Sequence, residues 1–300
     1  MIPDALSYEL SAVAPSLFLD DGQMRNNNKA DLMNDLLNPG KVEDYPVDSH
    51  HVFDGCAWLY QTAWPKIGMI SDLYKLFLKG VLYECKSRNQ ITVCFDDYET
   101  DATKGPEQKR RKHGVSTMQF DVKLNTPIPG DRQKFLADRT NKQRLIDLFS
   151  SLLMQDGVSV RHAVSDGDAD TLIVKESLTN ANQSTVVVHS FDTDVFVILL
   201  HHCCDDLHDI FMTTKKGIVS IKNVIAALDD DLRKCLLFSH AISGCDTVSA
   251  TLGIGKLKAF RKLKKSVHWL DLIKDFGEDS GNLDELILTV ENFFCPFMES

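Results

Sequence analysis

A valine-rich segment that runs directly into two aspartates is the feature that most constrains the fold of this chain. Residues 185–191 read Thr-Val-Val-Val-His-Ser-Phe, and Asp192 and Asp194 follow at once. A short run that is apolar on both faces is typical of a central strand in a parallel sheet. In open α/β sheets, ligands bind beyond the carboxyl ends of the strands. The segment therefore predicts a buried central strand that delivers two carboxylates to such an edge.

Two other predicted strands also end in aspartate. Residues 51–53 lead to Asp54, and residues 91–95 lead to Asp96. Neighbouring parallel strands end at the same edge of a sheet, so we expect these carboxylates to lie beside Asp192. Clustered carboxylates repel one another, and a fold that keeps them together needs a cation or a proton to compensate.

Three further aspartates extend the pattern. Asp168 and Asp170 precede an apolar run that begins at Leu172, where acidic side chains favour a helix start, and Asp246 lies in the loop Ser243-Gly244-Cys245-Asp246. Singly, each aspartate has a local explanation as a cap or turn residue. Jointly, they favour a shared site for Mg²⁺ or Mn²⁺, which prefer oxygen ligands. The predicted metal ligands are Asp54, Asp96, Asp168, Asp170, Asp192, Asp194 and Asp246.

Strands that alternate with helices predict an α/β fold, with a central, mostly parallel sheet and helices on both faces. Residues 209–213 and 218–221 predict a hairpin around Lys215-Lys216-Gly217. One helix is predicted to begin at Pro65. Other helices are predicted over residues 29–37, 131–153, 222–228, 230–242 and 256–265.

Composition limits the class of protein. A hydrophobic content of 43% and a charged content of 25% allow a large core. None of the 8 cysteines forms a CxxC pair, and no signal peptide or apolar run of membrane length is visible, so we expect reduced thiols in an intracellular protein, nuclear or cytoplasmic and not secreted. The formal net charge of −10 does not attract nucleic acid, so any such binding must come from local basic patches.

Two basic patches are present. The first contains Lys104 and residues 109–112; its ordinary alternatives are a solvated face or a nuclear localisation signal. In the second, Gly253 and Gly255 precede a basic helix whose first turn would offer backbone N–H groups to phosphate. On that helix, residues at spacing i, i+3, i+4 and i+7 share one face. The residues predicted to bind nucleic acid are Gly253, Gly255, Lys256, Lys258, Arg261, Lys262 and Lys265.

The order of these motifs resembles the PIN-like, flap-endonuclease type of 5′ nuclease. Asp54 matches the first acidic strand end of that family, Phe95-Asp96 the second, Asp192-x-Asp194 the third, and Gly244-x-Asp246 the last acidic motif. The chain departs from the family in two places. Asp97 replaces a glycine, and positions 168 and 170 hold aspartates where the family has glutamates. The phrases around Asp168, Asp192 and Asp246 also resemble a group of uncharacterised animal proteins, some of them transposon-derived.

The resemblance implies a three-layer, Rossmann-like PIN domain over residues 46–265, after an extension at 1–45 and before a helical segment at 266–300. It implies a basic arch within 99–130, in which Lys104 and Arg111 would orient the scissile phosphate. It also implies a helix–two-turn–helix element at 240–265 that grips DNA, with a monovalent cation at the Gly253–Gly255 turn. Catalysis would use two Mg²⁺ or Mn²⁺ ions.

Three functions remain open from the sequence. The first is a metal-dependent nuclease for which the sequence favours DNA over RNA; its oligomeric state is left open, and a monomer is compatible with the sequence. The second is a non-catalytic nucleic-acid-binding or scaffold protein that retains the fold. The third is a phosphatase of the haloacid-dehalogenase type, because Asp192-Thr193-Asp194-Val195 resembles its nucleophile motif. That motif normally opens its domain, whereas about 190 residues precede it in this chain.

Overall fold

The computed structural model describes residues 14–85, 90–97, 119–164, 168–245, 248–274, 287–290 and 292–293. The chain divides into two compact units. The larger unit spans Gly40–Asn223, and the smaller unit joins the residues up to Pro39 with those from Val224 onward. The described residues 14–39 therefore belong with the C-terminal part of the chain, whereas the sequence predicted a separate extension at 1–45.

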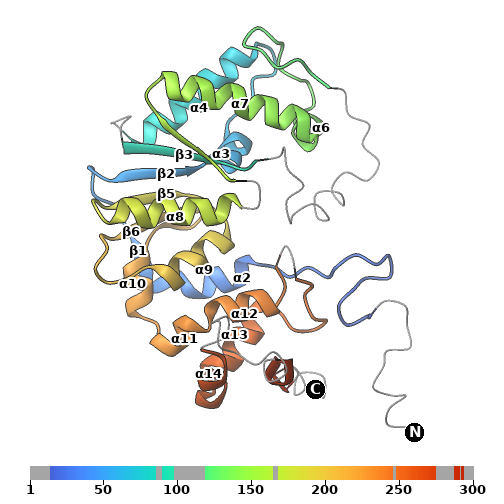
Figure 1. The fold of residues 1–300 in the computed structure, drawn as a ribbon, viewed down its shortest axis with the longest axis vertical. Helices are drawn as coiled ribbons and strands as arrows, with labels where there is room; N and C mark the ends of the chain where they lie inside the picture. The colour runs from blue at the N-terminus through green and yellow to red at the C-terminus, as the bar shows by residue number, and fades with distance from the viewer. Residues whose placement is uncertain are drawn as a thin grey trace. The chain divides into compact units, whose positions relative to one another are not determined.

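The larger unit contains a seven-stranded sheet in the order β1-β7-β6-β5-β2-β3-β4 (Figure 1). The five strands from β6 to β4 run parallel, and β7 is antiparallel to both of its neighbours, its hairpin partner β6 and the short edge strand β1. The predicted mostly parallel sheet and the predicted hairpin are thereby confirmed. The strands are β1 (Lys41–Val42), β2 (His50–Asp54), β3 (Ile91–Phe95), β4 (Ser159–His162), β5 (Val186–His189), β6 (Ile210–Thr214) and β7 (Gly217–Ser220).

Helices cover both faces of this sheet, as predicted. Phe53 and Val93 belong to a buried apolar cluster with side chains of α4 (Ile70–Glu84) and α7 (Arg139–Gln155). On the opposite face, α8 (Ala169–Ala181) packs across β2, β3 and β5. Alternate residues of a strand point to opposite faces, so each strand serves both layers. The remaining helices of this unit are α3 (Gly55–Gln61), α6 (Arg132–Ala137) and α9 (Thr193–His202), and α10 (Ile221–Ala226) spans the boundary.

Several helix boundaries differ from those predicted, for tertiary reasons. Helix α4 begins at Ile70 and not at Pro65, because the preceding Met69 is extended and bridges to Pro127. The single helix predicted over 131–153 is two helices, because Asp138 is extended and its carboxylate accepts a hydrogen bond from the backbone of Asn141 at the start of α7.

The direction in which the chain crosses the sheet reverses at β2. After β2 the chain adds β3 and β4 on one side, and then returns to place β5 and β6 on the other side. A reversal of this kind leaves a crevice beyond the carboxyl ends of the two strands at the switch, which are β2 and β5. The fold thus brings Asp54, the last residue of β2, and Asp192, which follows β5, to the carboxyl ends of these two strands.

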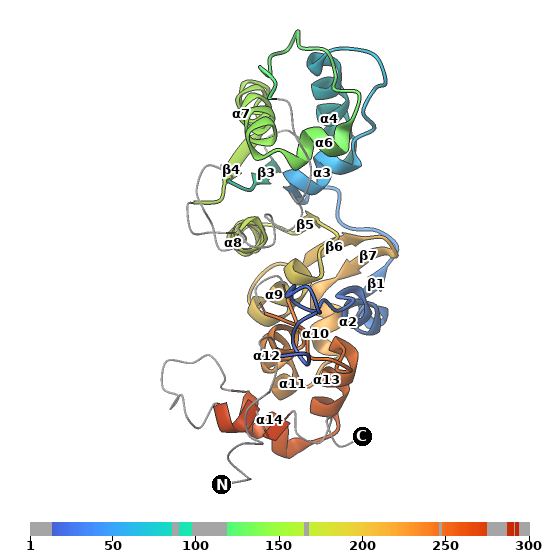
Figure 2. The ribbon, with the colours of Figure 1, turned by 90° about the vertical axis from the view of Figure 1, so that its right-hand side faces the viewer.

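The smaller unit is helical. Asn27 joins its two chain segments, because its side-chain amide donates to the carbonyls of Ser243 (2.6 Å) and Ile254 (2.9 Å). Helix α2 packs against α13, and Figure 2 shows α2 in blue next to the orange helices of this unit. None of the helices in the described part of the chain is long and apolar enough to cross a membrane. The helices are α2 (Ala30–Leu36), α11 (Asp230–Lys234), α12 (Leu236–Ile242), α13 (Lys256–Lys264) and α14 (Val267–Ile273).

Candidate metal centre and basic groove

The carboxyl ends of three adjacent parallel strands each carry an aspartate. In the sheet, Phe53 of β2 lies opposite His189 of β5, and Asp54 lies opposite Cys94 of β3. Asp96 and Asp192 come two and three residues beyond these partners. The strand registers therefore bring Asp54, Asp96 and Asp192 to one edge of the sheet. We refer to these three, with Asp168, Asp170 and Asp194, as the carboxylate cluster.

Asp170, Asp192 and Asp194 form the centre of this cluster. One oxygen from each lies within 4.8 Å of the others, and none of the three residues is exposed. They come from the first turns of α8 and α9, where the positive ends of the helix dipoles favour negative charge. Such an arrangement can hold a cation that prefers oxygen ligands.

Helix capping fixes the orientation of several members of the carboxylate cluster. The Asp192 carboxylate accepts a hydrogen bond from the backbone of Asp194 at 2.9 Å, and that of Asp54 accepts one from Ala57 at 2.8 Å. Asp168 caps α8 in the same way, and the neighbouring backbone N–H of Ala169 donates to Asp96 at 3.3 Å. The same side chains thus cap helices and belong to the carboxylate cluster.

Asp54 shows the electrostatic cost of the cluster. Burial is the main cause that raises the pKa of this carboxyl, from 3.8 to about 6, and the Asp96 and Asp192 carboxylates raise it further. The hydrogen bond from Ala57 and the ammonium of Lys142 act in the opposite direction. Burial and the neighbouring carboxylates thus disfavour the ionised form of Asp54, and a cation bound beside it would favour that form.

Lys142 is a site residue that the sequence analysis missed. It lies on α7, its exposed fraction is 8%, and its ammonium is 5.6 Å from the ring centre of Tyr60. Its charge lowers the pKa of Asp54 and also that of the neighbouring Cys56 thiol, which burial nevertheless raises to about 11. The local sequence gave no signal, because Lys142 is one of several basic residues on an amphipathic helix.

Three predicted site residues cannot be placed. Lys104, Arg111 and Asp246 lie outside the described residues. The predictions that Lys104 and Arg111 orient a phosphate, and that Asp246 is a ligand, stay predictions.

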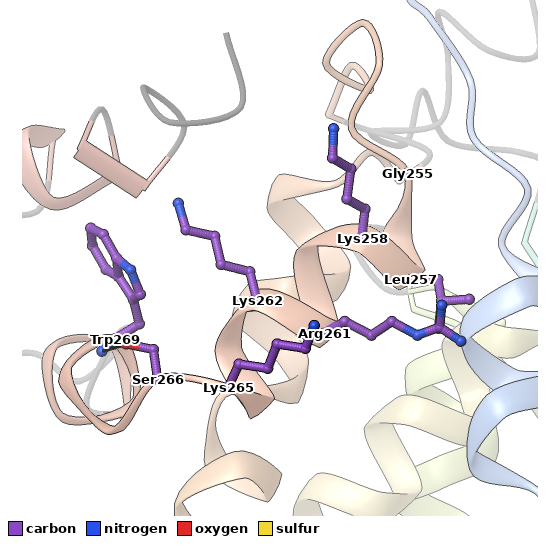
Figure 3. Close-up of a pocket in the computed structure, with 8 residues that line it drawn as sticks. All are labelled: Gly255, Leu257, Lys258, Arg261, Lys262, Lys265, Ser266 and Trp269. Atoms are coloured by element: carbon purple, nitrogen blue, oxygen red, sulfur yellow. Dashed lines mark hydrogen bonds between the residues drawn. The ribbon is translucent and has the colours of Figure 1, made fainter. Parts of the chain in front are cut away.

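The basic face predicted on residues 256–265 lines a groove in the smaller unit (Figure 3). The groove has a volume of about 710 Å³. Lys258, Arg261, Lys262 and Lys265 line it from α13 and the residue that follows, at the predicted spacing. Trp269 of α14 lies across from Lys262, and the remaining lining residues are Gly255, Leu257 and Ser266.

The turn before α13 has the glycine geometry that the sequence indicated. Gly253 has a φ of +76°, which side-chain-bearing residues rarely adopt, and Gly255 is the residue before the first turn of the helix. A side chain would meet no atom within 4 Å at either position. The turn is thus open to a ligand that approaches the backbone.

Lys256 does not lie on the basic face. Its exposed fraction is 1%, and its ammonium donates a hydrogen bond of 2.6 Å to the carbonyl of His240. The prediction that Lys256 contacts nucleic acid is not matched by this position, because a phosphate cannot reach a buried ammonium. The first residue of α13 points inward to join α13 to α12, and only tertiary packing determines this.

Similar proteins were found among solved structures. The T5 D15 protein co-crystallised with metal ions is 13% identical, with a TM-score of 0.48, over 82% of this chain and 87% of that one. The catalytic core of Rad2 in complex with DNA substrate is 16% identical, with a TM-score of 0.46, over 87% and 75%. Human GEN1 in complex with Holliday junction DNA is 13% identical, with a TM-score of 0.46, over 83% and 57%.

No family model matches the chain, and no curated protein matches it either. The transposon-derived origin stays a prediction.

Proposed function

We propose that this chain is a divalent-metal-dependent nuclease that hydrolyses phosphodiester bonds in DNA at particular structures, with two ions held by the carboxylate cluster. The observation that carries the proposal is the convergence of Asp170, Asp192 and Asp194, whose carboxylate oxygens lie within 4.8 Å of one another. Asp54 and Asp96 lie at the same edge of the sheet.

The donor set fits Mg²⁺ or Mn²⁺. Mg²⁺ takes oxygen ligands at about 2.0–2.1 Å, so two opposite ligands lie about 4.2 Å apart. The 4.8 Å spread of the three carboxylates is close to this span, and water molecules normally complete the shell. Bound there, a divalent cation lowers the pKa of a water ligand and stabilises the leaving oxygen of a phosphodiester.

Different residues of the chain would hold the ions, offset the charge of the carboxylates and bind the nucleic acid. Asp170, Asp192 and Asp194 would hold one ion, and Asp54 and Asp96 would lie nearer the second. Lys142 places a positive charge beside Asp54, where it partly offsets the repulsion between carboxylates. Lys258, Arg261, Lys262 and Lys265 would bind the nucleic acid through its phosphates, and the Gly253–Gly255 turn would offer its backbone to a phosphate or a monovalent cation.

The test is metal-dependent cleavage of flap, gapped and single-stranded DNA by the full chain, beside calorimetric titration with Mn²⁺. We expect cleavage only with a divalent cation. The double variant Asp192→Asn/Asp194→Asn should lose Mn²⁺ binding and at least about 100-fold in rate, because the pair carries two of the ligands. The matched control is Asp205→Asn/Asp206→Asn, which removes the same charge from an exposed turn. If the wild type and the Asp192/Asp194 variant behave alike, the proposal fails.

A second function, non-catalytic binding of nucleic acid, is favoured by the groove alone. It predicts salt-sensitive binding without turnover in any divalent cation, since phosphate contacts release counterions whether or not chemistry follows. The same assay with RNA substrates, and the molar mass in solution, would test the preference for DNA and the monomeric state.

A further inference from the structure

The groove on α13 contains an aromatic side chain, Trp269, beside its cationic side chains. Trp269 is held by its own helix start, where its backbone N–H donates to the Ser266 hydroxyl at 3.4 Å. Figure 3 shows its indole across the groove from Lys262. Backbone phosphates require cations and N–H groups, whereas a flat indole adds affinity for an unstacked base.

The charges around the indole suit a polyanionic strand. The described residues that line the groove include four cationic side chains and no carboxylate. Lys258 and Lys265 are seven positions apart, which is about 10.5 Å along a helix. They therefore span more than one phosphate of a strand, and both are exposed. Arg261 is committed in part to α2, since its guanidinium lies 3.3 Å from the Asp35 carboxylate.

Lys262 organises the aromatic wall. Its ammonium lies 4.9 Å from the ring centre of Trp269 and 4.4 Å from that of Phe293, and it donates to the Phe293 carbonyl. Trp269 and Phe293 meet edge to face, with ring centres 5.3 Å apart. The contacts with Lys262 and Phe293 thus hold the indole in place before any ligand arrives, so a base that stacks on it incurs little cost in side-chain entropy.

From this arrangement we propose that the groove binds a single-stranded nucleic-acid segment, whose phosphates contact Lys258 and Lys265 and one of whose bases stacks on Trp269. This inference rests on the proposed function and specifies which form of nucleic acid the smaller unit receives. It differs from a grip on duplex backbone, which would leave the indole unused.

The experiment is equilibrium binding to the full chain in EDTA, without turnover, followed by tryptophan fluorescence. The probes are a short oligothymidylate, an abasic oligonucleotide of equal length and a duplex. We expect the oligothymidylate to quench fluorescence and to bind roughly tenfold or more tightly than the abasic strand, because stacking contributes strongly per base. The fluorescence change of Trp269 itself is obtained by subtracting the change measured with Trp269→Phe from that of the wild type.

Two variants separate stacking from charge. Trp269→Leu should lose the tenfold preference for bases and retain salt-sensitive binding. Trp269→Phe preserves an aromatic ring that can pack against Phe293, and it should keep part of the preference. Lys258→Met/Lys265→Met should weaken binding of all three probes. The matched control, Lys264→Met, removes an exposed charge of α13 that does not line the groove and should change little.

Equal affinity for the abasic strand and the oligothymidylate would overturn the stacking contact. Tighter binding of the duplex, or no difference between wild type and Lys258→Met/Lys265→Met, would overturn the strand site. Failure of the nuclease proposal is distinguishable, because it would abolish metal-dependent cleavage and leave these affinities in EDTA intact.

Discussion

Gly55 lies directly against the ring of Phe95. A Cβ atom at Gly55 would meet that ring at 2.4–2.8 Å, closer than real contacts allow. Gly55 follows Asp54 and Phe95 precedes Asp96, so one close approach sets the separation of two strand ends that carry carboxylates. Phe95 is buried, and its ring stacks near Phe77 and His162, which leaves it little room to move.

We therefore expect Gly55→Ala to lower the free energy of unfolding by about 1–3 kcal/mol, the usual cost of overpacking a core. It should also weaken Mn²⁺ binding, since Asp54 and Asp96 would be displaced. Urea denaturation and calorimetric titration measure the two effects. The control is Gly130→Ala, at an exposed position where a Cβ meets nothing within 4 Å. Equal stability of the two variants would contradict the packing argument.

A buried histidine pair makes stability depend on pH. His51 Nδ1 and His189 Nε2 lie 2.8 Å apart, and both side chains are buried. Burial lowers the pKa of His51 to about 4 and that of His189 to about 3; His50 lowers the pKa of His51 further, and His51 lowers that of His189. Because the unfolded state binds protons more readily below pH 6.5, the folded state loses stability as the pH falls from about 6.5 towards 4.

The expected loss over that interval is on the order of 3 kcal/mol for each of the two histidines, at 1.36 kcal/mol for each unit of pKa difference. Urea denaturation between pH 7 and pH 4 measures it. The double variant His51→Phe/His189→Phe keeps two aromatic rings that do not titrate and should flatten the profile, whereas His208→Gln, at an exposed position, should not. An unchanged slope in the double variant would show that other groups cause the pH dependence.

Lys142 should tune the acidity of the metal site. Its ammonium lowers the pKa of Asp54, so Lys142→Met should raise that pKa above its present value of about 6. Protons would then compete with the cation at higher pH, and the pH at which Mn²⁺ affinity falls by half should rise. Calorimetric titration across pH 5–8 measures the shift. Lys134→Met removes an exposed ammonium of α6 and is the control; matching profiles would exclude this role for Lys142.

Lys256 should act on stability and not on binding. Its buried ammonium donates to the His240 carbonyl, and Lys256→Met leaves that carbonyl without this partner. We expect a loss of about 1–3 kcal/mol in the free energy of unfolding. Lys258→Met, at an exposed position two residues away, should stay within about 0.5 kcal/mol. A nucleic-acid affinity that falls in Lys256→Met without any loss of stability would contradict the structure.

Local sequence patterns were enough to predict most strands along the chain and the aspartates that end three of them. Alternation and apolar runs are local properties of the chain, so β2, β3 and β5 and their terminal aspartates could be predicted from residues alone. Helix faces are local as well, which is why Lys258, Arg261, Lys262 and Lys265 were expected to share a face and do.

Which of these groups meet, and which are buried, depends on the tertiary structure. Long-range strand pairing brings Asp192 to the same edge of the sheet as Asp54. Helix packing places Lys142 beside the carboxylates, buries Lys256 and sets Trp269 across from Lys262. Each depends on contacts between residues far apart in the chain, which no periodicity records. The physical reason is that burial and proximity, not residue type, set the electrostatic environment of a side chain.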